Sequence, residues 1–342
     1  MPDKYLSFEQ GGEIYNLYDL PKGFVIKGNL NLSHQDLIEL PDLSEVIVEG
    51  HFDCSNNKLK SLKGSPQKVG GCFDCSWNGL TTLEGAPQKV GSGFLASFNQ
   101  ITSLKGAPQE VGGEFDCDYC KLTSLEGAPQ KVGGDLKCGH NQLTSLKGAP
   151  KKVGGDFLCN NNKLTSLEDA PQEVGGSYIC SVNQLTSLEG MPLILNGDFY
   201  CSKNKLTSLE GAPLKIGGDF SCTYNQLTTL KDAPNMIGGM FWCSENPLTS
   251  LFKLPQMKED NSVWCDNALG KEYGFSDSSD SGIKSEDLLK SPRYQNEVKI
   301  DELRQKKHLE DVEKRAKTIK DTQAAFDAWL KQNGAGKTPP GK

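Results

Sequence analysis

The chain has 342 residues, of which 36% are hydrophobic and 37 are glycine, and its formal net charge is −7. A chain so poor in apolar residues is not expected to form one large core, but it can fold as short stacked units that share a core with their neighbours. The acidic balance disfavours nucleic acid and anionic membranes, which both require a basic face, and favours a basic protein partner.

The N-terminus has no basic run followed by an apolar stretch, and no segment approaches the roughly 18 consecutive apolar residues of a membrane helix. We therefore expect no signal peptide, no membrane partner and a cytoplasmic location in a bacterial or host cell. Nearly all of the 12 cysteines recur at one repeated position, which indicates packing in a reducing compartment rather than disulfide bonds.

Residues 1–47 contain apolar side chains without the strict spacing of the later chain, and end in a divergent unit at Leu30, Leu32, Leu37 and Leu40. The region that follows is periodic, and the open end of a repeat stack has to be covered. We therefore predict an N-terminal cap over 1–47.

Residues 48–267 repeat with a period of 21, and Ala96 fills the one gap in a cysteine column. The column contains Cys54, Cys75, Cys117, Cys138, Cys159, Cys180, Cys201, Cys222 and Cys243. The Phe-x-Cys segment of each unit predicts a short strand whose alternate residues, such as Phe157 and Cys159, point inward. An eleventh, degenerate unit follows at Val263, Cys265 and Asn267.

An asparagine stands three residues after most of these cysteines, as at Asn162, and its buried amide is suited to bonding the backbone of adjacent turns. One unit has Cys120 there, and Asn or Cys at this point follows the leucine-rich-repeat pattern. With Phe-x-Cys-x-x-Asn-x-Leu in register, residues 48–267 resemble a leucine-rich-repeat protein of the short bacterial and phage type. One departure is that Val69 and its counterparts stand four residues before the Phe rather than three.

The resemblance implies a mainly β solenoid of ten to eleven units, in which parallel strands form a right-handed arc. Twenty-one residues leave no room for a helix of average length in each unit, and the recurring Pro and Gly discourage one. The convex side is therefore expected to be extended.

The outward positions of the strands vary between units, and a repeat scaffold places its function there. Aromatic and apolar residues at these positions predict a partner-binding band on the concave face, made of Trp77, Phe98, Tyr119, His140, Leu158, Ile179, Tyr200 and Trp242. The position before the Phe supplies an acidic edge of Glu114, Asp135, Asp156, Asp198 and Asp219. Exposed rings beside one sign of charge are typical of protein recognition. A second interpretation is that part of this chain covers the band.

Residues 268–295 are rich in Ser, Asp and Gly and predict a flexible linker. Residues 296–333 predict an amphipathic helix, whose apolar stripe consists of Leu309, Val312, Ala316, Ile319, Gln323, Phe326 and Leu330. This helix either docks on the solenoid or self-associates as a coiled coil. Residues 334–342 predict a disordered tail.

Two Cys-x-x-Cys pairs, Cys72/Cys75 and Cys117/Cys120, raise the question of a metal site. They lie two units apart, about 10 Å in a stack of strands, whereas zinc requires four ligands within about 2.3 Å. We expect no catalytic residues, no cofactor and no metal, and a non-enzymatic protein-binding scaffold. The alternatives are a bacterial effector resembling ubiquitin ligases, and a glycan-binding module.

Overall fold

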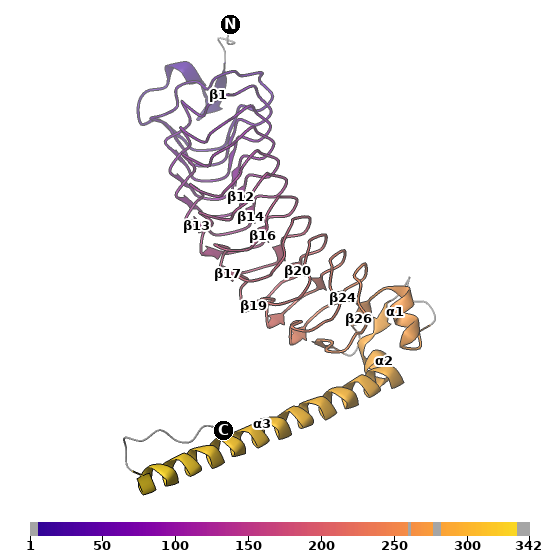
Figure 1. Ribbon diagram of the computed structural model, residues 1–342. Helices are drawn as coiled ribbons and strands as arrows, with labels where there is room; N and C mark the ends of the chain where they lie inside the picture. The colour runs from indigo at the N-terminus through magenta and orange to yellow at the C-terminus, as the bar shows by residue number, and fades with distance from the viewer. Residues whose placement is uncertain (1–5, 259–260, 276–281, 334–342) are drawn as a thin grey trace. The chain divides into compact units, whose positions relative to one another are not determined.

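The computed structural model describes residues 6–258, 261–275 and 282–333, and for 316, 318–319 and 321–333 it describes the backbone alone. The chain divides into two compact units, Met1–Asp287 and Leu288–Lys342. The first is a stack of similar loops, one for each repeat, which we call rungs (Figure 1). The predicted tail 334–342 lies outside the described residues.

The N-terminal part of the first unit begins with a hairpin. Strand β1 (Ser7–Gln10) pairs antiparallel with β2 (Glu13–Asn16), and the short 3-10 helix η1 (Leu17–Asp19) follows. The first rung of the stack comes next, with β3 (Val25–Ile26) and β4 (Leu30–Asn31). The solenoid ladder therefore starts inside residues 1–47, the range in which the sequence predicts a cap.

Each rung contributes one strand to a main sheet, which has 13 strands in the described part of the chain. All neighbours are parallel except the last pair, β26 with β27. We call the exposed side of this sheet, together with the turns that follow its strands, the main-sheet face; it corresponds to the predicted concave face. The strands after β4 are β6 (Phe52–Asp53), β8 (Phe73–Asp74), β10 (Phe94–Leu95), β12 (Phe115–Asp116), β14 (Leu136–Lys137), β16 (Phe157–Leu158), β18 (Tyr178–Ile179), β20 (Phe199–Tyr200), β22 (Phe220–Ser221), β24 (Phe241–Trp242), β26 (Ser262–Trp264) and β27 (Ile283–Lys284).

The opposite side of each rung is extended, as expected, and forms a second parallel layer in two sections. The first section joins β3 to β5 (Ile47–Val48), β7 (Lys68–Val69), β9 (Lys89–Val90), β11 (Glu110–Val111), β13 (Lys131–Val132), β15 (Lys152–Val153) and β17 (Glu173–Val174). The second section joins β19 (Ile194–Leu195), β21 (Lys215–Ile216), β23 (Met236–Ile237) and β25 (Gln256–Met257). We call the outer side of this layer the second-sheet face.

The core between the two layers repeats in every rung. Phe157, Cys159, Leu164 and Leu167 are fully buried, and so are their counterparts along most of the stack. The asparagine ladder that the sequence predicts is present. The Oδ1 atom of Asn162 accepts the Leu143 backbone N–H at 2.9 Å, and its amide donates to backbone carbonyls of both rungs. Backbone groups of the turns are thereby satisfied away from water.

The Gly-Gly pair of each rung forms a corner where successive turns approach closely. A Cβ atom on Gly154 would overlap the carbonyl oxygen of Gly133, one rung earlier. A Cβ on Gly155 would overlap the Oδ1 atom of Asp135. These contacts explain why the repeat keeps glycine here. The unusual spacing does not disturb the second layer, because Val69 pairs in register with Val48 and Val90 of the adjacent rungs.

Three helices follow the last rung in the described residues: α1 (Asn267–Glu272), α2 (Ser285–Lys290) and α3 (Pro292–Asn333). The range 268–295, predicted as a flexible linker, thus differs from the structure. It contains most of α1, β27, α2 and the start of α3, because Leu269, Tyr273, Ile283 and Leu288 are buried. The predicted helix 296–333 lies within α3.

Candidate interaction surface

Four of the predicted partner-binding residues form one continuous ring stack on the main-sheet face. Ring centroids are 4.0 Å apart between Trp77 and Phe98, 4.4 Å between Phe98 and Tyr119, and 4.1 Å between Tyr119 and His140. The planes are nearly parallel, within 11°. The amide nitrogen of Asn161 lies 3.3 Å from His140 Nε2, at one end of the stack.

These four residues lie in turns rather than on the strands, which differs from the sequence interpretation. Each has a positive φ, between 50° and 55°, and the residues at the same position in the other rungs from His34 to Glu245 have a positive φ as well. The left-handed conformation turns the chain immediately after each strand and brings successive side chains into line. Because each ring covers the face of the next, the stack presents ring edges to the solvent, and Trp77 and Tyr119 are exposed.

The other four predicted residues lie on the strands of the main sheet. The register pairs Leu158 with Ile179, and Ile179 with Tyr200, so these three side chains are neighbours in adjacent strands. Ser221 separates Tyr200 from Trp242. The structure therefore places the eight residues in two groups, a ring stack over four rungs and a strand group that begins in the next rung along the same sheet.

Sequence reasoning missed Trp264, which pairs in register with Trp242 and extends the strand group by one rung. The signal was available, because Trp264 directly precedes Cys265 of the degenerate unit. Trp264 is partly covered by its own chain: a Cβ on Gly282 would contact its indole ring. The uncovered part of the strand group therefore ends at Trp242.

A cluster of charged groups beside the ring stack was also missed. Lys137 Nζ lies 2.6 Å from a carboxylate oxygen of Glu114. Asp116 and Asp118 follow Glu114 in the same rung. Burial and the neighbouring Asp116 carboxylate raise the pKa of Asp118 to about 6. Asp118 nevertheless accepts the Gly139 backbone N–H at 2.5 Å, so it also joins two rungs.

The predicted acidic edge has a structural role. An Oδ1 atom of each aspartate accepts a backbone N–H from the next rung, as between Asp135 and Asp156 at 2.9 Å and between Asp198 and Asp219 at 2.8 Å. Asp156 and Asp219 make the same bond at 2.7 Å to Ser177 and Met240. One oxygen of each of these four carboxylates thus accepts a hydrogen bond from the backbone of the next rung. The negative charge on the main-sheet face therefore comes from carboxylates that also bond the backbone beside the Gly-Gly corner of each rung.

The cysteines of the repeated column pack in the core between the two layers. Its thiols are buried and donate weak bonds to carbonyl groups one rung away, such as Cys117 Sγ to the Lys137 oxygen at 3.2 Å. Burial raises the pKa of Cys117 and of Cys138 well above the ordinary value. Within the described residues, no group of three or more His, Cys, Asp or Glu is placed to hold a metal ion. Cys72 alone of the twelve cysteines is not buried.

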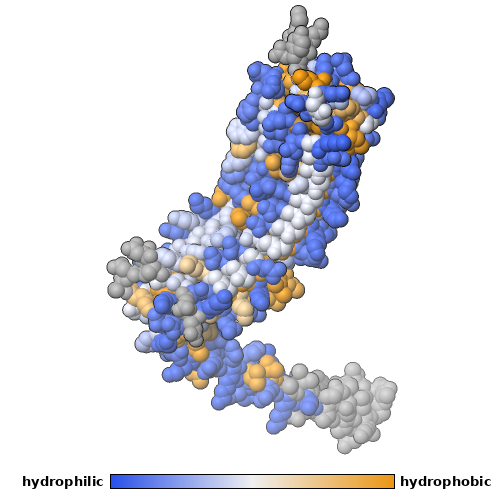
Figure 2. Space-filling model, turned by 180° about the vertical axis from the view of Figure 1, so that it is seen from behind, coloured by the Kyte–Doolittle hydropathy of each residue, from blue (hydrophilic) through white to orange (hydrophobic). Residues whose placement is uncertain are grey.

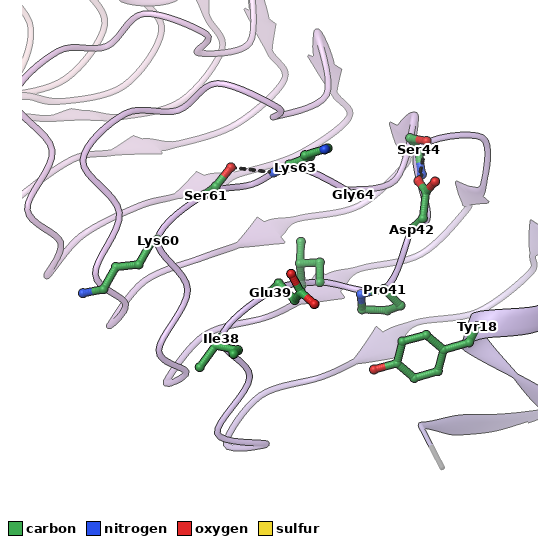
Figure 3. A pocket seen from close by; sticks show the side chains of 11 residues that line it. Tyr18, Ile38, Glu39, Pro41, Asp42, Ser44, Lys60, Ser61, Lys63 and Gly64 are labelled. Atoms are coloured by element: carbon green, nitrogen blue, oxygen red, sulfur yellow. Dashed lines mark hydrogen bonds between the residues drawn. The ribbon is translucent and has the colours of Figure 1, made fainter. Parts of the chain in front are cut away.

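A hollow near the N-terminal end was not predicted. It has a volume of about 670 Å³ and lies between η1 and the loops of the first rungs. Figure 3 shows Tyr18, Ile38 and Lys60 spread around it rather than converging on one point. No side chain there suggests a particular ligand. No helix in the described part of the chain is long and apolar enough to cross a membrane.

Stacked 21-residue rungs, a parallel main sheet and an asparagine ladder define a leucine-rich-repeat solenoid, the class that the sequence predicts. Comparisons with known protein families and with curated proteins find no match. Among solved structures, YopM, a leucine-rich effector protein from Yersinia pestis, is similar, with a TM-score of 0.53 and 23% identity over 70% of this chain and 66% of that one. YopM from Yersinia enterocolitica WA-314 gives a TM-score of 0.39 and 22% identity, over 72% and 67%. At this identity, the first likeness supports the leucine-rich-repeat fold.

Proposed function

We propose that this protein is a non-enzymatic scaffold that binds another protein on its main-sheet face. The observation that carries the proposal is the contrast between columns. Buried positions repeat the same residue in nearly every rung, whereas the outward positions after and within the strands, which are exposed or half-buried, change from Trp77 to His140 and from Leu158 to Trp242. Packing alone does not require large rings and aliphatic groups at these exposed positions, because Asn56, Asn161 and Ser221 occupy the same columns elsewhere.

The geometry of the ring stack favours a protein partner over a glycan. Sugar rings stack on open aromatic faces, but the faces of Phe98 and Tyr119 are covered by their neighbours. What remains is a row of ring edges, which carry the positive part of the aromatic quadrupole and pack against apolar side chains or against the faces of other rings. Such contacts are typical of anchoring residues in protein interfaces.

Charge suggests that the partner is basic. Asp116 and Asp118 lie beside the ring stack, and one oxygen of Asp156 and of Asp219 is not used in the backbone bonds described above. The chain as a whole carries a net charge of −7. An acidic rim around apolar anchors steers a basic partner and fixes its orientation.

The test compares partner capture by the full chain and by a variant in which Trp77→Asn and Tyr119→Asn are combined. Asparagine suits these positions because Asn56 and Asn161 already adopt the same left-handed conformation there. A second variant, Ile179→Ser with Tyr200→Ser, removes the strand group and uses the residue that stands at Ser221. We expect a partner identified with the unmodified chain to bind each variant at least about tenfold more weakly, since central anchors contribute about 2 kcal/mol or more.

The matched control is Gln88→Ala with Gln130→Ala on the second-sheet face, which should leave this affinity unchanged. Equal binding of the partner by all forms would refute the use of the main-sheet face. Binding of a glycan array by the unmodified chain, lost in the Trp77 variant, would support the glycan-binding alternative instead. Ubiquitin transfer by the purified chain would overturn the proposal that it is not an enzyme. The Yersinia pestis protein is described as an effector, and the same role here is part of the proposal only through the shared fold.

A further inference from the structure

The second-sheet face changes character in the last rungs. Over most of the stack, the two outward positions before the buried Val carry Gln, Lys or Glu, as at Gln130 and Lys131. From β19 onward these positions carry Leu193 and Ile194, then Leu214 and Lys215, then Asn235 and Met236. Of these, Leu193, Ile194, Leu214 and Met236 are 69%, 59%, 53% and 40% exposed. We call these four residues the apolar patch. Figure 2 shows one face of the molecule, on which hydrophobic side chains form small groups among hydrophilic ones.

The patch begins where the second layer is interrupted. β17 and β19 are not paired, although the main sheet continues through β18 and β20 in the same rungs. The bond from the Gly175 N–H to the Val153 carbonyl recurs from Gly217 to Leu195, but no bond from Asn196 to Val174 is present among the described residues. A hollow of about 340 Å³ lies at this break, lined in part by Val174, Ile194 and Asn196.

The charges near the patch are also distinctive. In earlier rungs, lysines and glutamates alternate along the column after the second buried Leu and form ion pairs, as between Lys147 and Glu126 at 2.6 Å. The alternation stops at Glu168, Glu189 and Glu210, three exposed glutamates in successive rungs. For these three, the described residues provide no ion pair within 4.0 Å. Glu189 and Glu210 therefore share their rungs with Leu193, Ile194 and Leu214, whereas Lys231 occupies the same column in the rung of Met236.

Helix α3 has a face with the complementary chemistry. Ile300 and Leu303 are 40% and 67% exposed. Arg304 and Lys307 follow at helical spacing, so the four side chains share one face of the helix. Asp311 continues this face. In the second layer, Lys215 lies between Ile194 and Met236 in the register. Leu309 and Val312, part of the predicted stripe, lie on the other side of the helix. The rest of that stripe, from Ala316 onward, lies outside the described side chains.

We propose that the apolar patch binds helix α3 of a second copy of this chain. Ile300 and Leu303 cover Leu193, Ile194 and Leu214, and Arg304 and Lys307 approach the glutamate row. Removing these apolar groups from water drives the association, and the opposite charges orient the helix. This contact leaves the main-sheet face free and does not depend on the proposed partner there.

The experiment measures the mass of the full chain by sedimentation velocity over about a hundredfold range of protein concentration. The patch variant combines Leu193→Gln, Ile194→Lys and Leu214→Gln, the residue types that these columns carry in other rungs, so it keeps the repeat consensus. The helix variant combines Ile300→Gln with Leu303→Gln. We expect the unmodified chain to associate as concentration rises, and each variant to remain monomeric over the same range.

Mixing the two variants restores one complete contact, between the intact helix of the patch variant and the intact patch of the helix variant, so association should return in the mixture. The matched control, Leu309→Gln with Val312→Gln, changes the other side of α3 and should associate like the unmodified chain. A monomeric unmodified chain would overturn the proposal. That result is the one expected of docking within one chain. Association that only the control variant abolishes would also overturn the proposal, because it indicates a coiled coil, and so would a mixture of the patch and helix variants that stays monomeric, because it contains one intact patch and one intact helix.

Discussion

Tyr178 is the one aromatic residue of the buried ring column that carries a hydroxyl group, and its replacement tests the packing directly. Phe occupies the equivalent position in most rungs, including Phe157 and Phe199 on either side. Tyr178 is fully buried, and its hydroxyl has no hydrogen-bond partner among the described residues. Its ring packs edge-on against both neighbours, at 74° and 84°, whereas Phe199 and Phe220 are stacked at 2°.

We expect Tyr178→Phe to stabilise the protein. A buried hydroxyl without a partner costs about 1–3 kcal/mol, and phenylalanine removes that cost while filling nearly the same volume. The gain should therefore be about 1–2 kcal/mol. It would raise the denaturant midpoint without a change in the slope of the transition, because the surface exposed on unfolding is unchanged.

The assay is urea unfolding followed by circular dichroism, with Phe220→Tyr as the matched control. That substitution introduces a hydroxyl into the same column and should lower the midpoint by a similar amount. A lower midpoint for Tyr178→Phe would show that the hydroxyl has a favourable partner, and would refute the reasoning from burial.

Two further predictions concern the main-sheet face. Val182 adopts a φ of 58°, which is unfavourable for a β-branched residue. Val182→Asn should therefore stabilise the protein by about 1 kcal/mol in the same unfolding assay. Asn161→Val, at the same position one rung earlier, should destabilise the protein by a similar amount. The raised pKa of Asp118 means that the folded state binds its proton more tightly than the unfolded chain, so stability falls as pH rises from 3.8 to about 6. Asp118→Asn keeps an acceptor for the Gly139 N–H and should stabilise at pH 7, on the order of 1 kcal/mol after allowance for solvent screening, with no gain below the ordinary pKa of aspartate. Equal midpoints for the two proteins across this pH range would contradict the assigned cause.

The repeat made much of the fold predictable. A period of 21 with Phe157, Cys159 and Leu164 at constant offsets specifies which side chains are buried, because a residue that recurs in every rung meets its own counterpart above and below. The asparagine ladder follows for the same reason, since one amide spans the backbone of two rungs. The candidate residues of the strand group, such as Ile179, could also be placed, because alternation in a strand assigns them to the exposed side.

The sequence by itself thus determined the stack, its core and the columns that face the solvent, because those depend on spacing alone. Only the tertiary structure decided which contacts the residues of these columns make with the neighbouring rungs. It placed Trp77 and Phe98 in left-handed turns, where their faces cover one another, and it committed an oxygen of Asp135 to the next backbone. It also separated β17 from β19, beside Leu193 and Ile194. These outcomes depend on distances of a few ångströms between residues about one repeat apart, which spacing along the chain does not specify.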